Sequence, residues 1–364
     1  METGGGGWLV RFLKTRRSPS IVQALGHGVF LLMQLKGRLL DRFFQGKRLA
    51  ETEKVFLDGI AQCVRKAEDS IGRNRYKCFI GAEPGGLAAA ATIGQKMSVP
   101  VVYYNLELHL VAESRTIMEK VVKSCEKKFN KNAAFTITLD EERAESLARD
   151  NEISISDILT VPVCADGPRF EEKTDWLRKK FNLSAQDRIL LYAGFITEWA
   201  MCEELAKTAM TWPDNRVLVL HSHGYHNPRF IEKLRKYEGK KVKISREPVA
   251  YDDLPSLLAS ADIGIALYRD IGKNFTLVSS ASGKLSHYLK SGLPVITNDY
   301  PGMTKVIEKY GCGRCVDRVE KISEAMEMIF NNYDLMRGNA YTCYEENYLF
   351  SKQFTPVIER IKKL

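Results

Sequence analysis

The stretch SSASGKLSHYLKSGLPVITND, residues 279–299, joins a turn of small residues to an amphipathic segment and then to an apolar strand. This order predicts one helix–strand repeat of a parallel α/β sheet. Lys284 follows Ser282 and Gly283 at the expected start of the helix. Because a helix N-terminus attracts anions through its free N–H groups and its dipole, the pattern favours a phosphate site in this turn.

The same alternation of apolar strands and helical segments continues on both sides of this stretch. Strands are expected, in chain order, at residues 76–82, 99–108, 133–138, 158–163, 188–196, 216–224, 241–245 and 262–270. A long amphipathic helix is expected over residues 110–129, and a glycine-rich turn at residues 83–86. The fold class is therefore α/β, with two series of parallel strands covered by helices.

The alternation breaks at residues 164–186, where turn-forming and polar residues gather. Because 364 residues exceed the usual size of a single core, this break predicts a domain boundary. We expect an N-terminal domain over residues 1–165, a second domain over residues 166–345, and a C-terminal helix over residues 346–364 that packs back on the first domain. Two such halves imply a cleft between them, with ligands bound beyond the carboxyl ends of the strands.

The positive charge of the chain is concentrated near residue 1. Residues 1–50 carry nine Lys or Arg and two acids, which accounts for +7 of the net charge of +9. Residues 20–35, between the basic clusters, are too short and too polar for a membrane span. They predict either a helix lying on an anionic membrane surface or a core helix with charged ends. Aromatic residues do not alternate with the basic ones, which argues against nucleic acid as a partner.

The cysteines bear on the compartment. Eight are scattered along the chain, and Cys312 and Cys315 form the one CxxC pair. Neither a second pair nor metal-spaced histidines accompany it, so the pattern favours free thiols over zinc or a redox pair. The first residues show no cleavable signal-peptide pattern. We therefore expect a cytoplasmic protein, peripheral at the inner face of the membrane.

In the second half of the chain, four positions follow predicted strands and should meet at one edge of the sheet. They are Gly194, the turn at residues 221–224, the strand exit at residues 268–270, and the Lys284 turn. His221 and His223 would share a face, but without a third ligand they do not predict a metal site. The sequence therefore predicts an anion site without a metal at this edge.

In the first half, acidic residues follow two predicted strands. Glu107 ends an apolar strand, and its carboxylate could position an acceptor or a transferred group. His109 comes two residues later and is the weaker candidate. Glu83, with the glycines at 85 and 86, follows the preceding strand and could line the same edge. The charged run 141–143 is better explained as the first turn of a helix.

Five segments of the second half resemble, in their order, a known family of proteins. In chain order they read LYAGFI, VLVLHSHG, LPSLLASADIGIALY, SGKLSHYLKSGLPVITND and VIEKYGCGRCV. Their order is similar to the donor domain of GT-B glycosyltransferases, above all the retaining family 4 type of bacterial polysaccharide and lipid glycosylation. The resemblance covers residues 188–316 well and residues 76–165 more loosely. It implies two Rossmann-like domains facing across a cleft, with an abbreviated or atypical N-terminal domain.

This resemblance also implies an activity. A sugar would pass from a nucleoside-diphosphate donor to a hydroxyl of a carbohydrate or lipid-linked acceptor, in polysaccharide or glycolipid synthesis. The donor diphosphate is expected over Gly194, Phe195, Ser280, Ser282, Gly283 and Lys284. The family commonly has two glutamates eight positions apart, and here Ser279 and His287 stand in their places, with His287 facing the donor ribose. No metal or other cofactor is implied, because the helix dipole and basic side chains serve the diphosphate.

Two other classes of function stay open. A nucleotide-sugar epimerase of similar architecture predicts paired acid and base residues in the cleft, and the sequence shows no clear pair. A catalytically silent GT-B-like scaffold or partner-binding protein would explain the missing glutamates. The retained turn with Lys284 favours an enzyme over a scaffold, because a scaffold needs no anion site.

Overall fold

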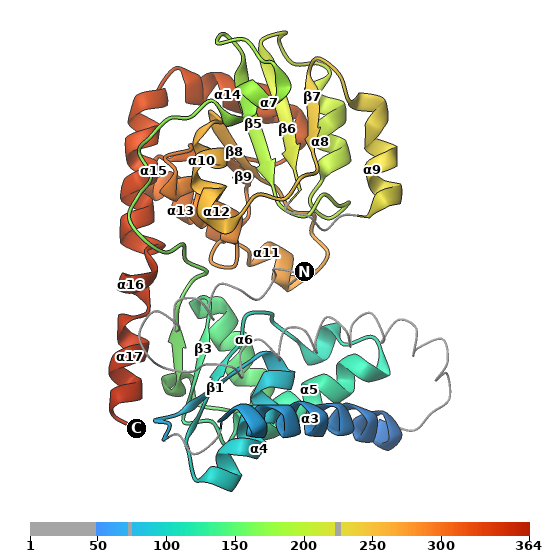
Figure 1. Cartoon of the computed structure of the whole chain (residues 1–364), viewed down its shortest axis with the longest axis vertical. Coiled ribbons are helices and arrows are strands. Elements are labelled where there is room, and N and C mark those ends of the chain that lie inside the picture. Colours follow the sequence, from blue (N-terminus) through green and yellow to red (C-terminus); the bar gives the residue numbers. More distant parts are fainter. Residues whose placement is uncertain (1–48, 72–74, 223–226) are drawn as a thin grey trace. The chain divides into compact units, whose positions relative to one another are not determined.

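The computed structural model describes residues 49–71, 75–222 and 227–364. The chain forms two compact units, which are shown in Figure 1. Of the described residues, those up to Val161 and Phe354–Leu364 form unit 1, and those from Pro162 to Gln353 form unit 2. The predictions for the basic N-terminal segment up to residue 48, and for His223 and Gly224, fall outside the described residues.

Unit 1 contains a sheet of four parallel strands in the order β1-β2-β3-β4. The strands are β1 (Phe79–Ala82), β2 (Val101–Tyr104), β3 (Phe135–Thr138) and β4 (Ile158–Thr160). The α-helices are α3 (Leu49–Ile71), α4 (Glu83–Met97), α5 (Ile117–Asn130), α6 (Glu141–Asn151) and α17 (Thr355–Lys362). Every residue of β2 and β3 is buried, as the apolar runs of parallel strands predict.

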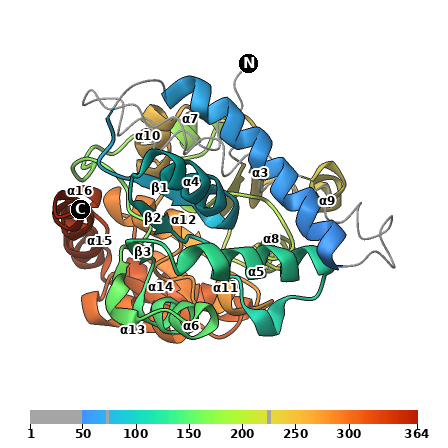
Figure 2. The same ribbon diagram turned by 90° about the horizontal axis from the view of Figure 1, so that it is seen from below.

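Helix α3 shows how the sequence builds the helical layer of unit 1. Its apolar residues recur every three or four positions and form one buried stripe of Phe56, Ile60, Val64, Ala67 and Ile71. The helix packs against α4 and α5, and Figure 2 shows it running beside them. The spacing of its apolar residues therefore explains which face of α3 is buried against the unit.

Two predicted boundaries in unit 1 are wrong. The helix expected over residues 110–129 begins only at Ile117. There Thr116 accepts a hydrogen bond from the Glu119 amide while the Glu119 side chain accepts one from the Thr116 amide. The glycine-rich turn expected at residues 83–86 is instead the first turn of α4. The capping box decides where α5 begins, whereas α4 begins at Glu83 without a side-chain cap.

Unit 2 contains a sheet of six parallel strands in the order β10-β9-β8-β5-β6-β7. The strands are β5 (Arg188–Ala193), β6 (Arg216–His221), β7 (Val242–Ser245), β8 (Ile263–Ala266), β9 (Val295–Asn298) and β10 (Gly313–Val316). The strand order reverses between β5 and β8. This pair is therefore the topological switch point, where such sheets bind ligands beyond the carboxyl ends of the strands.

Ten α-helices surround the described part of this sheet. They are α7 (Trp176–Phe181), α8 (Cys202–Ala209), α9 (Pro228–Leu234), α10 (Leu254–Ala259), α11 (Lys273–Thr276), α12 (Gly283–Lys290), α13 (Pro301–Tyr310), α14 (Ile322–Phe330), α15 (Tyr333–Asn347) and α16 (Phe350–Gln353). The last residues of the chain, which contain α17, then belong to unit 1.

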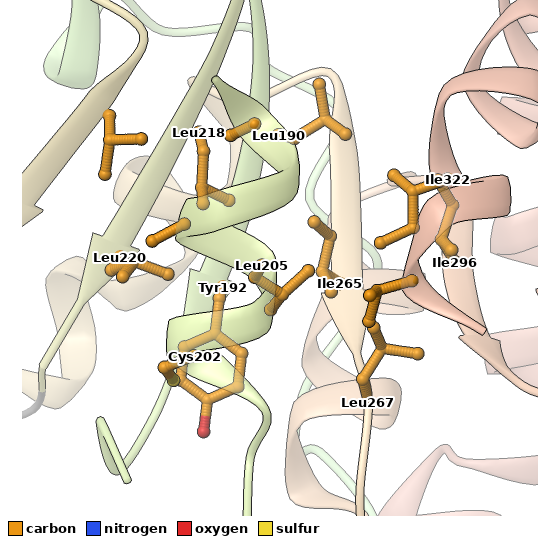
Figure 3. Close-up of a cluster of buried hydrophobic side chains, with 14 of the residues drawn as sticks. Leu190, Tyr192, Cys202, Leu205, Leu218, Leu220, Ile265, Leu267, Ile296 and Ile322 are labelled. Carbon is orange, nitrogen blue, oxygen red and sulfur yellow. The ribbon is translucent and has the colours of Figure 1, made fainter. Parts of the chain in front are cut away.

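Successive residues of β5 alternate between the two faces of this sheet. Leu190 and Tyr192 pack in one buried cluster with α8, α9 and α14, and Leu191 packs in another with α12, α13 and α15. Figure 3 shows Tyr192 beside Cys202 at one end of the first cluster, with the tyrosine hydroxyl directed away from the aliphatic side chains. Unit 2 thus has helices on both faces of a parallel sheet, as the sequence predicts.

Candidate functional site

At the switch point, one tyrosine of α12 fills the space between the diverging strands. β5 and β8 pair through only two residue pairs, Leu190 with Ile263 and Leu191 with Gly264. The Tyr288 hydroxyl accepts a hydrogen bond from the Ala193 amide at 2.7 Å and donates to the Leu191 carbonyl at 3.1 Å. A Cβ on Gly264 would lie 2.6 Å from the Tyr288 ring, so glycine is required beside it. Tyr288 thereby fixes α12 against the carboxyl end of β5.

The turn before α12 is held by its own side chains. Ser282 is the N-cap residue, and its hydroxyl accepts a hydrogen bond from the Leu285 amide at 3.2 Å. The same hydroxyl is 2.6 Å from the hydroxyl of Tyr268, which follows β8. The amides of Gly283 and Lys284 are among the first-turn donors that an α-helix directs toward an external acceptor. We name residues 279–284 the anion turn.

Lys284 and Gly194 come together at this turn, although ninety positions separate them. A Cβ on Gly194 would lie 3.3 Å from Lys284 Cδ and 3.5 Å from its Nζ, and 3.2 Å from the Tyr192 hydroxyl. Phe195, next to Gly194, is exposed. The structure therefore brings the predicted glycine turn after β5 and the predicted lysine of α12 to one place, as the parallel topology requires.

The anion turn is also anchored from outside. The Val163 amide donates a hydrogen bond to the Ser280 carbonyl at 2.7 Å. The buried Tyr348 donates one to the Ser279 carbonyl at 3.2 Å. Ser279 itself is buried. A backbone amide near the start of unit 2 and a tyrosine hydroxyl near its end therefore hold the backbone of the turn in place.

His287 lies one turn further along α12 and is buried. Its ring meets the ring of Tyr251 edge-on, with centroids 5.9 Å apart. Burial, with a smaller contribution from Lys290, lowers the pKa of His287 to about 3, so the imidazole is neutral at pH 7. A contact between His287 and a donor ribose stays a prediction.

In unit 1, Glu83 occupies the junction between β1 and α4. The residue is fully buried and has a left-handed backbone with φ of 61°, which is uncommon for a residue other than glycine. Its Oε1 accepts hydrogen bonds from the amides of Leu106 and Glu107 at 2.7 and 3.0 Å. The carboxylate thus fixes the segment after β2 against the start of α4.

The other oxygen of Glu83 faces His109. Glu83 Oε2 lies 3.6 Å from His109 Nε2, which is an ion-pair distance. Burial alone would lower the pKa of His109, but the Glu83 carboxylate, with Glu126 and Glu107, outweighs burial and raises it. Burial and then Glu83 raise the pKa of Glu107, although its side chain reaches solvent, so that shift carries little free energy. The structure therefore brings Glu83, Glu107 and His109 to one edge of the sheet.

Polar residues that the sequence did not assign to the site lie behind this cluster. Arg143 on α6 is buried, with its Nε 3.6 Å from Asp140 and its Nη1 3.4 Å from the Leu106 carbonyl. Asn105, which follows β2, donates to the Glu107 carbonyl at 2.8 Å. The position of Asn105 directly after an apolar strand was a usable signal. Arg143 gave none, because an arginine in a charged first turn is expected on the surface.

The predicted histidines of β6 do not form a described metal site. His221 is buried, and its Nδ1 lies 2.9 Å from the Ser245 hydroxyl at the end of β7. Within the described ranges, no group of three or more His, Cys, Asp or Glu side chains could hold a metal ion. All eight cysteines lie in described segments and are free thiols.

The chain resembles proteins of known family and structure. Residues 230–346 match the family model of the glucosyltransferase 3-like C-terminal domain. HepE from Anabaena, solved in complex with UDP and glucose, superposes with a TM-score of 0.64 at 14% identity, over 84% of this chain and 82% of HepE. Sucrose-phosphate synthase from Thermosynechococcus elongatus gives a TM-score of 0.65 at 16% identity, over 85% of this chain and 79% of that chain. No curated protein matches the sequence significantly.

A third structure extends this picture. WaaG, a glycosyltransferase involved in lipopolysaccharide biosynthesis, gives a TM-score of 0.53 at 15% identity, over 76% of this chain and 82% of WaaG. Together with the family match, these likenesses confirm the predicted GT-B fold and the predicted class of protein, a glycosyltransferase. The chain therefore has the GT-B fold, and its residues 230–346 match the model of the glucosyltransferase 3-like C-terminal domain.

Proposed function

We propose that this chain transfers a sugar from a nucleoside-diphosphate donor to an acceptor hydroxyl. The observation that carries the proposal is the anion turn, where Lys284 and the capped start of α12 lie beside Gly194 at the switch point. Because HepE was solved with UDP and with UDP-glucose, a uridine diphosphate sugar is the first donor to test.

The anion turn suits the chemistry of the donor. During transfer, the bond between the anomeric carbon and the diphosphate oxygen breaks, and negative charge develops on the leaving diphosphate. The Lys284 ammonium and the first-turn amides of α12 would stabilise this charge without rearranging. A new bond forms between the anomeric carbon and the acceptor oxygen, and the hydroxyl proton is released. Lys284 supplies the positive charge, so the proposal requires no metal ion.

We assign the cluster in unit 1 to the acceptor side. Glu107 reaches solvent and would accept hydrogen bonds from acceptor hydroxyls. The Glu83 carboxylate raises the pKa of His109 and would favour its protonated form. Retention of configuration at the anomeric carbon belongs to this proposal through the family 4 resemblance. A carbohydrate or lipid-linked acceptor fits the same resemblance.

The site of action is a further part of the proposal. The charge of residues 1–50 would bring the enzyme to the anionic inner face of the cytoplasmic membrane. In the segments that the structure describes, no helix is both long and apolar enough to cross a bilayer. Binding to vesicles with and without anionic lipid, before and after removal of residues 1–48, tests this part separately.

A thermal-shift panel tests the donor proposal. UDP, GDP, ADP and CDP, each free and sugar-linked, are added to the wild type and to the Lys284→Ala variant. A ligand that binds only the folded state raises the melting temperature, so one nucleotide should shift the wild type and not the variant. Lys305→Ala, which removes an exposed lysine of α13, is the matched control and should behave as wild type.

The outcome separates the open alternatives. A shift that depends on Lys284, followed by release of the nucleoside diphosphate when a saccharide acceptor is added, supports the transferase. Conversion of the sugar nucleotide without release of the diphosphate would point to an epimerase. A folded wild type that responds to no nucleotide would contradict the proposal and favour a scaffold.

A further inference from the structure

The ammonium of Lys284 lies among three aromatic rings. Its Nζ is 4.7 Å from the ring centroid of Tyr268, 5.3 Å from that of Tyr192 and 5.6 Å from that of Trp199. All three distances are within the range of cation–π attraction, and tryptophan is the strongest partner for it. We name Tyr192, Trp199 and Tyr268 the aromatic cage. Its members come from β5, from the loop after β5 and from the residues after β8, on both sides of the switch point.

Each ring of the cage is held by other contacts. The buried Tyr192 donates a hydrogen bond to the Phe195 carbonyl at 2.7 Å. Tyr268 is buried and its hydroxyl meets the N-cap residue of α12. The cage therefore has a fixed shape on two of its sides.

Trp199, the third side, is held in its loop. Its ring stacks on Tyr268 with centroids 6.2 Å apart, and it meets Phe275 of α11 edge-on at 5.5 Å. Its carbonyl accepts a hydrogen bond from the Arg269 amide at 2.8 Å. The loop after β5 is thereby tied to the exit of β8, and the indole stays over the lysine.

We propose that Tyr192, Trp199 and Tyr268 are positioning residues that hold Lys284 in place for a donor diphosphate. The inference rests on the proposed function, since it assigns to the cage the task of aiming the lysine of the anion turn. A lysine side chain is flexible and loses rotamer freedom when it binds an anion. The cage restricts this freedom before the donor arrives.

Aromatic rings suit this task better than a carboxylate. A carboxylate partner would neutralise the ammonium and occupy its N–H donors, whereas ring faces attract the charge and accept no ordinary hydrogen bond. In the described segments, no acidic side chain forms an ion pair with Lys284. The ammonium thus keeps its net charge and its three donors for phosphate oxygens.

The test compares removal of a cage ring with removal of a ring elsewhere in unit 2. UDP affinity is measured by titration calorimetry at fixed salt for the wild type, Trp199→Leu and Tyr237→Leu. Trp199→Leu removes one cation–π contact and should weaken UDP binding about 3- to 30-fold. Tyr237→Leu is the remote control, because it removes the contact of Tyr237 with Lys236 at 4.8 Å and should not change UDP affinity.

A double-mutant cycle separates positioning from a general loss of structure. In a Lys284→Met background, Trp199→Leu should cause no further loss of UDP affinity, because the cage acts through the lysine. Equal losses in both backgrounds, or no loss from Trp199→Leu in the wild type, would overturn the inference and leave the proposed function standing. A wild type that binds no nucleoside diphosphate would overturn the proposed function, and this inference with it.

Discussion

The backbone of Gly194 lies against the side chain of Lys284, with room for a hydrogen at the α-carbon but little for a methyl group. A glycine at the end of β5 and a lysine of α12 therefore share one small volume. The two residues are adjacent only because β5 and α12 meet at the switch point. A larger residue at position 194 would therefore displace the Lys284 side chain, and the effect on binding can be measured.

Replacing Gly194 by alanine should move the lysine. The added Cβ would be 3.3 Å from Lys284 Cδ, so the side chain must shift by a few tenths of an ångström. We expect UDP affinity to fall about 3- to 10-fold, which corresponds to about 1 kcal/mol. Gly239→Ala, where a Cβ meets nothing within 4 Å, should leave affinity unchanged. If Gly194→Ala binds UDP as tightly as wild type, Lys284 does not contact the bound nucleotide as proposed.

The Tyr348 hydroxyl should matter for binding as well as for stability. Tyr348→Phe removes the donor to the Ser279 carbonyl and should cost about 1 kcal/mol of unfolding free energy. It should also weaken UDP binding a few-fold, because the anion turn loses an anchor. The matched control is Tyr344→Phe in α15, the helix that Tyr348 directly follows. The Tyr344 hydroxyl donates to the Ala165 and Gly167 carbonyls instead. If both variants lose stability and neither loses affinity, the turn does not depend on this anchor.

The Glu83–His109 pair should make stability depend on pH above neutrality. The folded pKa of His109 is raised, so the pair contributes fully below the unfolded value of about 6.5 and its contribution is lost as pH rises through the folded pKa. In urea unfolding, the advantage of wild type over His109→Gln should therefore be larger at pH 6 than at pH 9. An advantage that grows with pH would contradict the pairing.

His287 should have the opposite effect on the acid side. It is held neutral in the fold, with a pKa of about 3, whereas the unfolded chain takes up a proton near pH 6.5. Stability is therefore lost as pH falls from about 6.5 toward 3. His287→Phe keeps a ring against Tyr251 and removes the proton uptake, so it should lose less unfolding free energy than wild type between pH 7 and pH 4.5. Parallel curves for the two proteins would show that His287 is not buried in solution.

Removal of metal ions should leave the proposed activity in place. The expectation follows from Lys284 and the start of α12, which supply positive charge and N–H donors to the diphosphate. Initial rates with and without EDTA, measured on enzyme freed of divalent ions, should agree within about 2-fold. A loss of activity in EDTA that Mg²⁺ or Mn²⁺ restores would show that the diphosphate is neutralised by a metal instead.

The sequence predicts the architecture well where the pattern is local. The strands of unit 2 and the capped start of α12 follow from period and turn chemistry, and parallel topology then brings Gly194 to Lys284. The start of α5 was missed because its capping box interrupts an apolar pattern that continues across it. The buried place of Arg143 was missed because it depends on Leu106, a contact between distant segments.

The aromatic cage lies beyond sequence reasoning for the same reason. Tyr192 and Tyr268 are ordinary strand-end residues in the sequence, and Trp199 is one of two aromatic residues in the mostly apolar loop after β5. The sequence predicts that the strand exit at Tyr268 meets the Lys284 turn, but no spacing indicates that the rings of Tyr192 and Trp199 also face this ammonium. Glu83 is similar, because only the structure shows that its carboxylate is occupied by two backbone amides.

Helix α17 has a consequence for the order in which the protein is made. Val357 on this helix is fully buried, and Arg360 donates to the Ser156 carbonyl at 3.1 Å and lies over the Phe135 ring. These contacts belong to unit 1, yet the ribosome adds α17 only after all of unit 2. Unit 2 is continuous and can fold as soon as it has emerged, whereas unit 1 must wait for residues 354–364. A chain cleaved directly after α16 would therefore keep all of unit 2, and would leave unit 1, with its first-made strands and the Glu83–His109 pair, as the incomplete part.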